Sequence, residues 1–128
     1  MTLNNSGYIY IVTNMEHDNA KKYKIGRTTE TVKELKSRYQ TGMHLPIIYR
    51  YKCHNILLME IFLLDKIFGN NVLDHESGNK SEWIHYCDGI ISLKKTVKQF
   101  CEHFNEFYED TNGQCDLEMF CNYCGIAY

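Results

Sequence analysis

The chain has 128 residues, of which 44% are hydrophobic and 23% charged, and its formal net charge is −2. This length allows one domain with its own core, and the composition is typical of a soluble globular protein. A net charge so close to zero does not by itself indicate a polyanionic partner.

No segment of the sequence has the pattern of a membrane span or a secretory signal. The apolar stretch at residues 56–68 contains three charged residues and is too short to cross a bilayer. Residues 1–6 have neither a basic start nor an apolar segment. We therefore expect an intracellular protein without membrane contact, in which the six cysteines are reduced thiols.

The first predicted element is a β-hairpin. In residues 7–13 the side chains alternate, with Tyr8 and Tyr10 on one face and Ile9 and Ile11 on the other, as in a half-buried strand.

A polar loop at residues 14–19 and a second alternating run at residues 23–26 complete this hairpin. Tyr10 and Lys24 fall on one face if they pair across it. The sequence does not fix the register, and a slip of one residue separates the two side chains.

A helix is predicted after the hairpin. Thr31 and Glu34 have the spacing of a capping box, and Val32, Leu35 and Tyr39 follow as an amphipathic stripe.

A strand at residues 47–53 and a helix at residues 56–68 come next. This helix is apolar almost all round, so we expect it to be the buried central helix. Glu60 is an unusual residue in this helix, because burying an ionised carboxylate among apolar neighbours costs free energy unless a cation pairs with it.

Residues 69–80 are expected to form a solvated loop that contacts nucleic acid, and the acidic and histidine residues at 74–76 are not treated as metal ligands. A short strand at residues 81–86 places Trp83 in the core. A long apolar stripe then predicts a helix from about residue 89, which ends at Asn112-Gly113.

Two short motifs resemble those of a known family. Residues 8–10 read Tyr-Ile-Tyr and residues 24–28 read Lys-Ile-Gly-Arg-Thr. They are similar to the two motifs of the GIY-YIG nuclease superfamily, and more closely to its T5orf172 branch, which is common in phages and large DNA viruses. The resemblance covers roughly residues 7–86 and implies a virus- or phage-encoded endonuclease that hydrolyses phosphodiester bonds of DNA.

The resemblance implies a catalytic role for five residues. Tyr10 would take a proton from the attacking water, and Lys24 would lower the pKa of Tyr10 or bind phosphate. Arg27 or Arg38 would bind the non-bridging phosphate oxygens. Glu60 would hold one divalent ion, Mg²⁺ or Mn²⁺.

The chain departs from the family pattern in its first long helix. The family has a phosphate-contacting arginine about four residues before the Tyr-x-Thr-Gly that begins here at Tyr39, and this chain has Leu35 there. Tyr8 is the alternative base if the alignment shifts. Lys24 occupies the place of the family's second-motif tyrosine, and Tyr23 could stand in for that tyrosine.

Structural roles for the same residues stay open. Arg38 has the spacing for a surface ion pair with Glu34, and Glu60 at a helix edge could reach water or a lysine. Tyrosines are also favoured in strands without any catalytic role.

The charges are unevenly distributed along the chain. Residues 21–38 have a net charge of +5 and residues 101–128 a net charge of −6. The basic run predicts a DNA-binding surface with salt-dependent affinity. Its candidate nucleic-acid-binding residues are Lys21, Lys22, Arg27, Lys33, Lys36 and Arg38.

The resulting fold prediction is α+β. A small, mostly antiparallel sheet of three or four strands is flanked by three helices in the order β-β-α-β-α-β-α, within a domain at residues 1–110. Residues 111–128 form an acidic, cysteine-containing tail, which we expect to pack across the basic face and screen it.

Cysteines in the tail allow a second interpretation. Cys115, Cys121 and Cys124, with Cys101 or His103, could bind a structural Zn²⁺ ion, although the spacing is not that of a standard zinc site. Small buried hydrophobic side chains are the favoured interpretation.

Two further functional classes stay open beside the endonuclease. One is a binding module for nucleic acid or protein that has lost catalysis, which Leu35 favours. The other is a zinc-stabilised interaction protein. The sequence does not determine the form of the substrate, the cleavage specificity or the oligomeric state.

Overall fold

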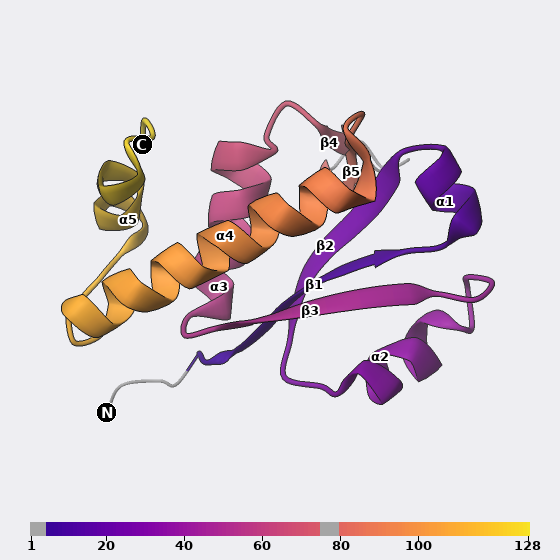
Figure 1. The fold of residues 1–128 in the computed structure, drawn as a ribbon, viewed down its shortest axis with the longest axis horizontal. Helices are drawn as coiled ribbons and strands as arrows, with labels where there is room; N and C mark the ends of the chain where they lie inside the picture. The colour runs from indigo at the N-terminus through magenta and orange to yellow at the C-terminus, as the bar shows by residue number, and fades with distance from the viewer. Residues whose placement is uncertain (1–4, 75–79) are drawn as a thin grey trace.

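The computed structural model describes residues 5–74 and 80–128, and it is built around one open antiparallel sheet (Figure 1). The elements in chain order are β1 (Gly7–Thr13), α1 (Met15–Asn19), β2 (Lys22–Thr28), α2 (Val32–Tyr39), β3 (Ile47–Cys53), α3 (Ile56–Ile61), the π-helix η1 (Phe62–Ile67), β4 (Val72–Asp74), β5 (Lys80–His85), α4 (Gly89–Asp110) and α5 (Leu117–Cys124). The five strands lie in the order β3-β1-β2-β5-β4, and all neighbouring pairs are antiparallel.

The predicted α+β class is confirmed, but the prediction undercounts the elements. The sheet has five strands rather than three or four, because β4 forms within the segment that was expected to be a solvated loop. Val72 of β4 pairs with Ile84 of β5. The remainder of that predicted loop, at residues 75–79, lies outside the described residues. The helices α1 and α5 were also not predicted.

β1 separates two hydrophobic cores. Ile9 and Ile11 are fully buried in the larger core, on the face that α3 and α4 cover. Tyr10 and Val12 lie in a smaller core on the opposite face, with Leu35 of α2. The alternation of β1 therefore places the Tyr10 ring on the α2 face of the sheet.

The β1–β2 hairpin has the register that the site prediction needs. Tyr10 lies opposite Gly26, and Val12 lies opposite Lys24. Because these positions differ by two residues, Tyr10 and Lys24 project from the same face, as expected. The polar loop is not an irregular turn but the short helix α1, whose first turn is capped by the Asn14 side chain.

α2 begins with the predicted capping box. The Thr31 hydroxyl accepts a hydrogen bond from the backbone N–H of Glu34, and the Glu34 carboxylate accepts one from the backbone N–H of Thr31. This cap fixes the start of the helix and so the direction in which its later residues point. Leu35 faces the sheet and is fully buried.

The helix predicted at residues 56–68 has two parts. A regular α-helix ends at Ile61, and one π-helical stretch continues to Ile67. This helix was expected to be the buried central one: Ile56, Leu58 and Met59 are buried, whereas Leu57 and Ile61 are exposed. Glu60 lies in the last turn before the change of helix type, and such π-helical insertions often occur beside functional sites.

α4 crosses the larger core and ends where the sequence predicts. Leu93, Val97, Cys101 and Phe104 of α4 are buried, and the chain leaves the helix through Asn112 and Gly113, both at positive φ. Only glycine and a few polar residues adopt this backbone conformation readily, so the pair makes an effective stop.

The C-terminal tail packs into the larger core. Phe120 of α5 is fully buried, with its ring centroid 4.8 Å from that of Phe62 and 5.1 Å from that of Phe104. The tail therefore packs against α4 and η1 rather than across the basic residues 21–38, which corrects the screening prediction. All six cysteines are free thiols, and the described residues contain no group of three His, Cys, Asp or Glu side chains placed to hold a metal ion.

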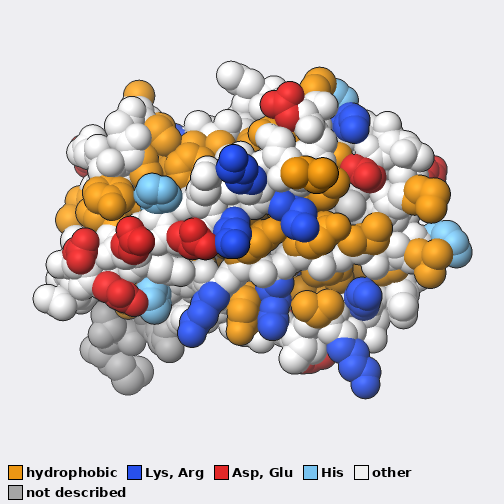
Figure 2. Space-filling view, in the orientation of Figure 1, with side chains coloured by type: hydrophobic (Ala, Val, Ile, Leu, Met, Phe, Trp, Pro, Cys, Tyr) orange, Lys and Arg blue, Asp and Glu red, His pale blue; other side chains and the backbone are white. Residues whose placement is uncertain are grey.

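Charges also separate along α4 (Figure 2). Figure 2 shows Lys and Arg side chains over the middle of this face and Asp and Glu side chains toward its left end. Along its sequence, α4 has Lys94, Lys95 and Lys98 in its first half and Glu102, Glu106, Glu109 and Asp110 in its second half. Among the described residues, no helix is long and apolar enough to cross a membrane.

Candidate active site

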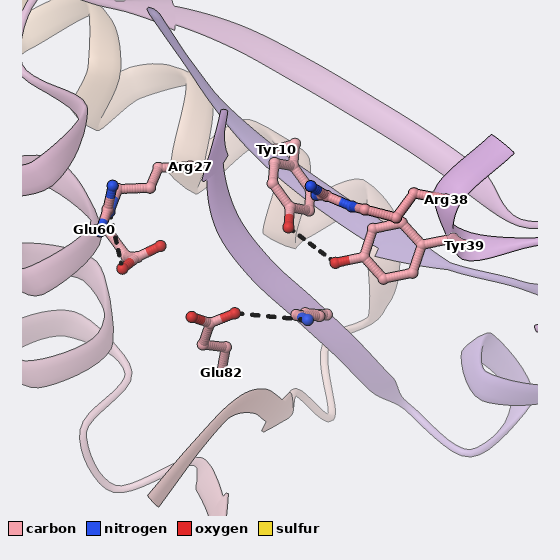
Figure 3. Close-up of a pocket in the computed structure, with 7 residues that line it drawn as sticks. Tyr10, Arg27, Arg38, Tyr39, Glu60 and Glu82 are labelled. Carbon is pink, nitrogen blue, oxygen red and sulfur yellow. Dashed lines mark hydrogen bonds and ion pairs between the residues drawn. The ribbon is translucent and has the colours of Figure 1, made fainter. Parts of the chain in front are cut away.

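A pocket of about 500 Å³ opens where β5 diverges from β2 (Figure 3). Over the described part of the chain, β5 pairs with β2 along Lys22–Lys24, and the remainder of β2 has no strand on that side. Side chains from β1, β2, α2, α3 and β5 fill the margin of this gap. The lining residues are Tyr10, Lys24, Arg27, Arg38, Tyr39, Glu60 and Glu82. The structure thus brings all five predicted catalytic residues to one pocket.

Two tyrosine hydroxyls meet in this pocket. The Tyr10 and Tyr39 oxygens are 2.8 Å apart and share a hydrogen bond, and the Tyr10 side chain is otherwise buried. Burial, followed by the hydrogen bond to Tyr39, raises the pKa of Tyr10. The positive charge that acts in the opposite direction on this pKa is that of Arg38, whereas the sequence suggested Lys24. Tyr10 is therefore a neutral phenol at neutral pH.

The Tyr10 ring lies directly over Gly26 of the neighbouring strand. A Cβ atom at position 26 would stand 2.5 Å from both the phenolic carbon and the oxygen of Tyr10. Carbon atoms do not approach this closely, so the absence of a side chain at Gly26 makes room for the ring.

α2 contributes different residues to the core and to the pocket. Leu35, at the place of the family's arginine, is fully buried beside Tyr10. Arg38 lies nearly one turn later and lines the pocket, with its Nη1 atom 2.6 Å from Oε1 of Glu30. The alternative pairing of Arg38 with Glu34 is not what the structure has, since the Glu34 carboxylate serves the helix cap.

Glu60 reaches the pocket from the last turn of α3. Its carboxylate lies 3.4 Å from Nε of Arg27, and its side chain is only 15% exposed. Burial, followed by the negative charge of Glu82, raises the pKa of Glu60, and Arg27 offsets part of this effect. An under-compensated carboxylate of this kind attracts a cation.

Lys24 and Glu82 form the remaining ion pair of the pocket. Their charged atoms are 3.5 Å apart, with 24% of the Lys24 side chain and 46% of the Glu82 side chain exposed. The Lys24 ammonium also lies 5.2 Å from the centre of the Tyr39 ring, within the range of a cation–π interaction. Lys24 therefore stands beside the tyrosine pair at the solvent side of the pocket.

The six predicted nucleic-acid-binding residues do not form one compact patch. Arg27 and Arg38 line the pocket, whereas Lys33 and Lys36 are exposed on α2. Lys21 and Lys22 lie at the hairpin end of β2, where the backbone of Lys21 accepts a hydrogen bond from Tyr86.

The two alternative tyrosines lie apart from the pocket lining. The Tyr8 ring stacks under the guanidinium of Arg50, whose central carbon is 3.6 Å from the ring centre. Tyr23 is fully buried on the opposite face of β2, and its hydroxyl donates to Asp18 at 2.6 Å. These positions favour Tyr10 over Tyr8 as the pocket tyrosine, and they place Tyr23, the stand-in for the second-motif tyrosine, outside the pocket lining.

Sequence reasoning did not select two of the lining residues. Tyr39 begins the Tyr-x-Thr-Gly motif and also closes the apolar stripe of α2, so its hydroxyl could have been placed near Tyr10. Glu82 precedes the core residue Trp83, and strand alternation points it to the other side of β5. Glu82 lines the pocket because β5 diverges from β2, and no local sequence pattern predicts this divergence.

The pocket residues fit a hard divalent cation. Glu60 and Glu82 both face the space between α3 and β5, as Figure 3 shows, and their negative charges act on each other. Carboxylate oxygens supplemented by water and phosphate oxygens are the usual ligands of Mg²⁺. Glu60 is thus suited to hold such an ion.

Comparisons with known proteins give one partial relative and one family. The chain is 35% identical over 78 residues to the Uncharacterized protein R9 of Acanthamoeba polyphaga mimivirus, a match that covers 59% of this chain. The matched region spans 20% of the length of that relative. No solved structure matches the chain. The T5orf172 domain family matches residues 7–116, which include every lining residue of the pocket, and the chain belongs to this nuclease-associated family.

Proposed function

We propose that the chain is a metal-dependent endonuclease of the GIY-YIG type that hydrolyses phosphodiester bonds of DNA. One observation carries the proposal: the tyrosine pair, three cationic side chains and a largely buried carboxylate line the same pocket. Phosphodiester hydrolysis needs a proton acceptor for water, positive charge on the phosphate and a stabilised leaving oxygen. Each requirement has a candidate among these residues.

Arg27, Arg38 and Lys24 would bind the phosphate. Arginine guanidinium groups make paired hydrogen bonds to phosphate oxygens, and a lysine ammonium adds a point charge. These residues come from β2 and α2, so a phosphate between them would lie beside the Tyr10 hydroxyl.

Tyr10 would receive the proton of the attacking water. While Tyr10 is neutral, its hydroxyl shares a hydrogen bond with that of Tyr39, and a lone pair of its oxygen would accept a hydrogen bond from the attacking water and so orient it. Tyr10 becomes a base only when added positive charge lowers its pKa, and Arg38 already acts in this direction. An Mg²⁺ ion held by Glu60 would supply further positive charge to the phosphate and to an ionised oxygen.

The proposal is tested by nicking of supercoiled plasmid in Mg²⁺ or Mn²⁺. The wild type should nick, and Tyr10→Phe and Glu60→Gln should each reduce the rate about 10²-fold or more. Tyr123→Phe and Glu118→Gln make the same chemical changes on α5 and should leave the rate unchanged. Equal rates for wild type and both pocket variants would contradict the assignment.

A DNA-binding module without catalysis is the second candidate. It is favoured by Leu35, which occupies the place of the family's arginine and is buried where it cannot reach phosphate. A wild type that shifts DNA at low salt in a gel but never nicks plasmid would support this second function.

A further inference from the structure

Each cation of the pocket is held by a carboxylate of the same chain. The pairs are Lys24 with Glu82 at 3.5 Å, Arg27 with Glu60 at 3.4 Å and Arg38 with Glu30 at 2.6 Å. A phosphate that enters this pocket must therefore compete with carboxylates for the groups that would bind it.

We propose that Glu82 makes phosphate binding in this pocket conditional on a divalent cation. In the free protein Glu82 holds Lys24, and when the cation is present Glu82 joins Glu60 as its second carboxylate and releases Lys24 to the phosphate. This inference rests on the proposed function and adds to it a metal ligand and a coupling between two binding events.

The geometry makes Glu82 the adjustable partner. The Lys24–Glu82 pair is long and partly exposed, and pairs of this kind contribute little and break easily. Glu82 and Glu60 approach the same space from β5 and α3, as Figure 3 shows. A cation between them would be balanced by two negative charges, whereas Glu60 alone supplies one.

Glu30 does not share this property. Its contact with Arg38 is a short charge-assisted hydrogen bond, its carboxylate also accepts from the Thr28 hydroxyl, and it is not among the residues that line the pocket. The Glu30–Arg38 pair can therefore persist while Glu60 and Glu82 exchange partners.

Charge balance explains the direction of the coupling. Without a cation, a phosphate beside Lys24 and Arg27 brings a third negative charge next to two carboxylates. With a divalent cation on those carboxylates, their negative charge is balanced, and the same phosphate meets Lys24 freed from Glu82. Binding of the cation and of DNA then strengthen each other by the same factor, since such coupling is reciprocal.

The test measures binding of a short labelled DNA duplex by fluorescence anisotropy at matched ionic strength, with Mg²⁺ or with EDTA. All proteins carry Tyr10→Phe, so the DNA stays intact. Mg²⁺ should raise the affinity of the otherwise unchanged protein about fivefold or more. Glu82→Gln should bind more tightly than its parent in EDTA and should lose most of the Mg²⁺ response, whereas Glu118→Gln should keep it.

A second readout uses the metal without DNA. Mn²⁺ bound to the protein, counted by electron paramagnetic resonance, should be held more weakly after Glu82→Gln and equally after Glu118→Gln. Equal behaviour of these two variants in either measurement would overturn the inference while leaving the proposed function in place. A parent protein that binds no DNA in either buffer would instead overturn the proposed function, and the coupling with it.

Discussion

The ionised form of Glu60 costs free energy in this fold. Its side chain is largely buried, and burial together with Glu82 raises its pKa more than Arg27 lowers it. A carboxyl group whose pKa is raised by folding favours the unfolded state wherever it is ionised. Ionisable groups with a strongly shifted pKa are found disproportionately at functional sites, where they are retained for binding or catalysis rather than for stability.

This cost predicts that Glu60→Gln stabilises the protein at neutral pH in EDTA while it abolishes nicking. The stabilisation should be full above the folded-state pKa of Glu60. It should shrink as the pH falls through that value and vanish below the ordinary value of 4.5, where the wild-type group is protonated as well. Thermal unfolding followed by circular dichroism across this pH range measures the difference, with Glu118→Gln as the control. A variant that melts below the wild type at neutral pH would mean that the Arg27 ion pair outweighs burial.

α2 places a core residue and a pocket-lining residue three positions apart. Leu35 fills the smaller core beneath Tyr10, and Arg38, on the more exposed side, reaches the pocket. The capping box at Thr31 fixes the helix start, so both side chains depend on one well-defined helix. Leu35 stands where the family carries an arginine, and Arg38 of the same helix brings a guanidinium to the pocket.

Substitutions in α2 should therefore separate stability from DNA affinity. Leu35→Ala should lower the free energy of unfolding by about 2–5 kcal/mol, because it leaves a cavity beside Tyr10. Arg38→Ala should change this free energy by less than about 0.5 kcal/mol, since the side chain is half exposed. Arg38→Ala should nevertheless weaken DNA binding about tenfold, roughly 1.4 kcal/mol.

Urea denaturation and fluorescence anisotropy measure the two effects. Lys36→Ala on the exposed side of the same helix serves as the control for a lost positive charge. If Arg38→Ala and Lys36→Ala weaken DNA binding equally, Arg38 acts as one surface charge among several.

The molecule as a whole folds around the larger core, to which both ends of the described chain contribute. Phe120 of α5 contacts aromatic rings of η1 and α4, while Ile9 of β1 enters the same core from the sheet. Residues 111–128 are thus tied to the sheet through α4. Unfolding should be a single transition that includes the tail.

The substitution Phe120→Ala tests whether the tail unfolds together with the rest of the protein. It should destabilise the whole protein by about 3–5 kcal/mol, as expected for a large aromatic side chain removed from a core. The loss should be the same whether urea denaturation is followed by far-UV circular dichroism or by fluorescence of Trp83, which lies at the other core. Glu118→Ala on the same helix should have little effect. Two separate transitions in the wild type would show that the tail folds as a unit of its own.

Local sequence patterns predicted those elements of the fold that depend on residues close together in the sequence. Alternation in β1 gave the face on which Tyr10 lies, and the long apolar stripe gave α4 with its Asn112-Gly113 end. β4 has only three residues, too few for an alternating pattern to be recognised. The change to a π-helix at Phe62 likewise has no local signature, because it depends on how the helix packs.

The site residues that lie within the two sequence motifs could be predicted from the sequence. Tyr10, Lys24 and Arg27 lie within the two motifs, and Glu60 was conspicuous as a charge among apolar neighbours. The residues that pair with them were harder to predict from the sequence. Glu82 reaches the pocket because β5 leaves β2 after Lys24, which is a property of the assembled sheet.

The contact between the Tyr10 ring and Gly26 has a consequence for comparing sequences of this kind. A side chain of any size at position 26 would occupy the space of the phenol, so the two positions form one steric unit although sixteen residues separate them. The glycine of the second motif therefore reports on the tyrosine of the first motif. Homologous chains that keep the tyrosine but replace this glycine must hold the ring in another orientation, and the paired identity of these two positions distinguishes intact pockets from eroded ones.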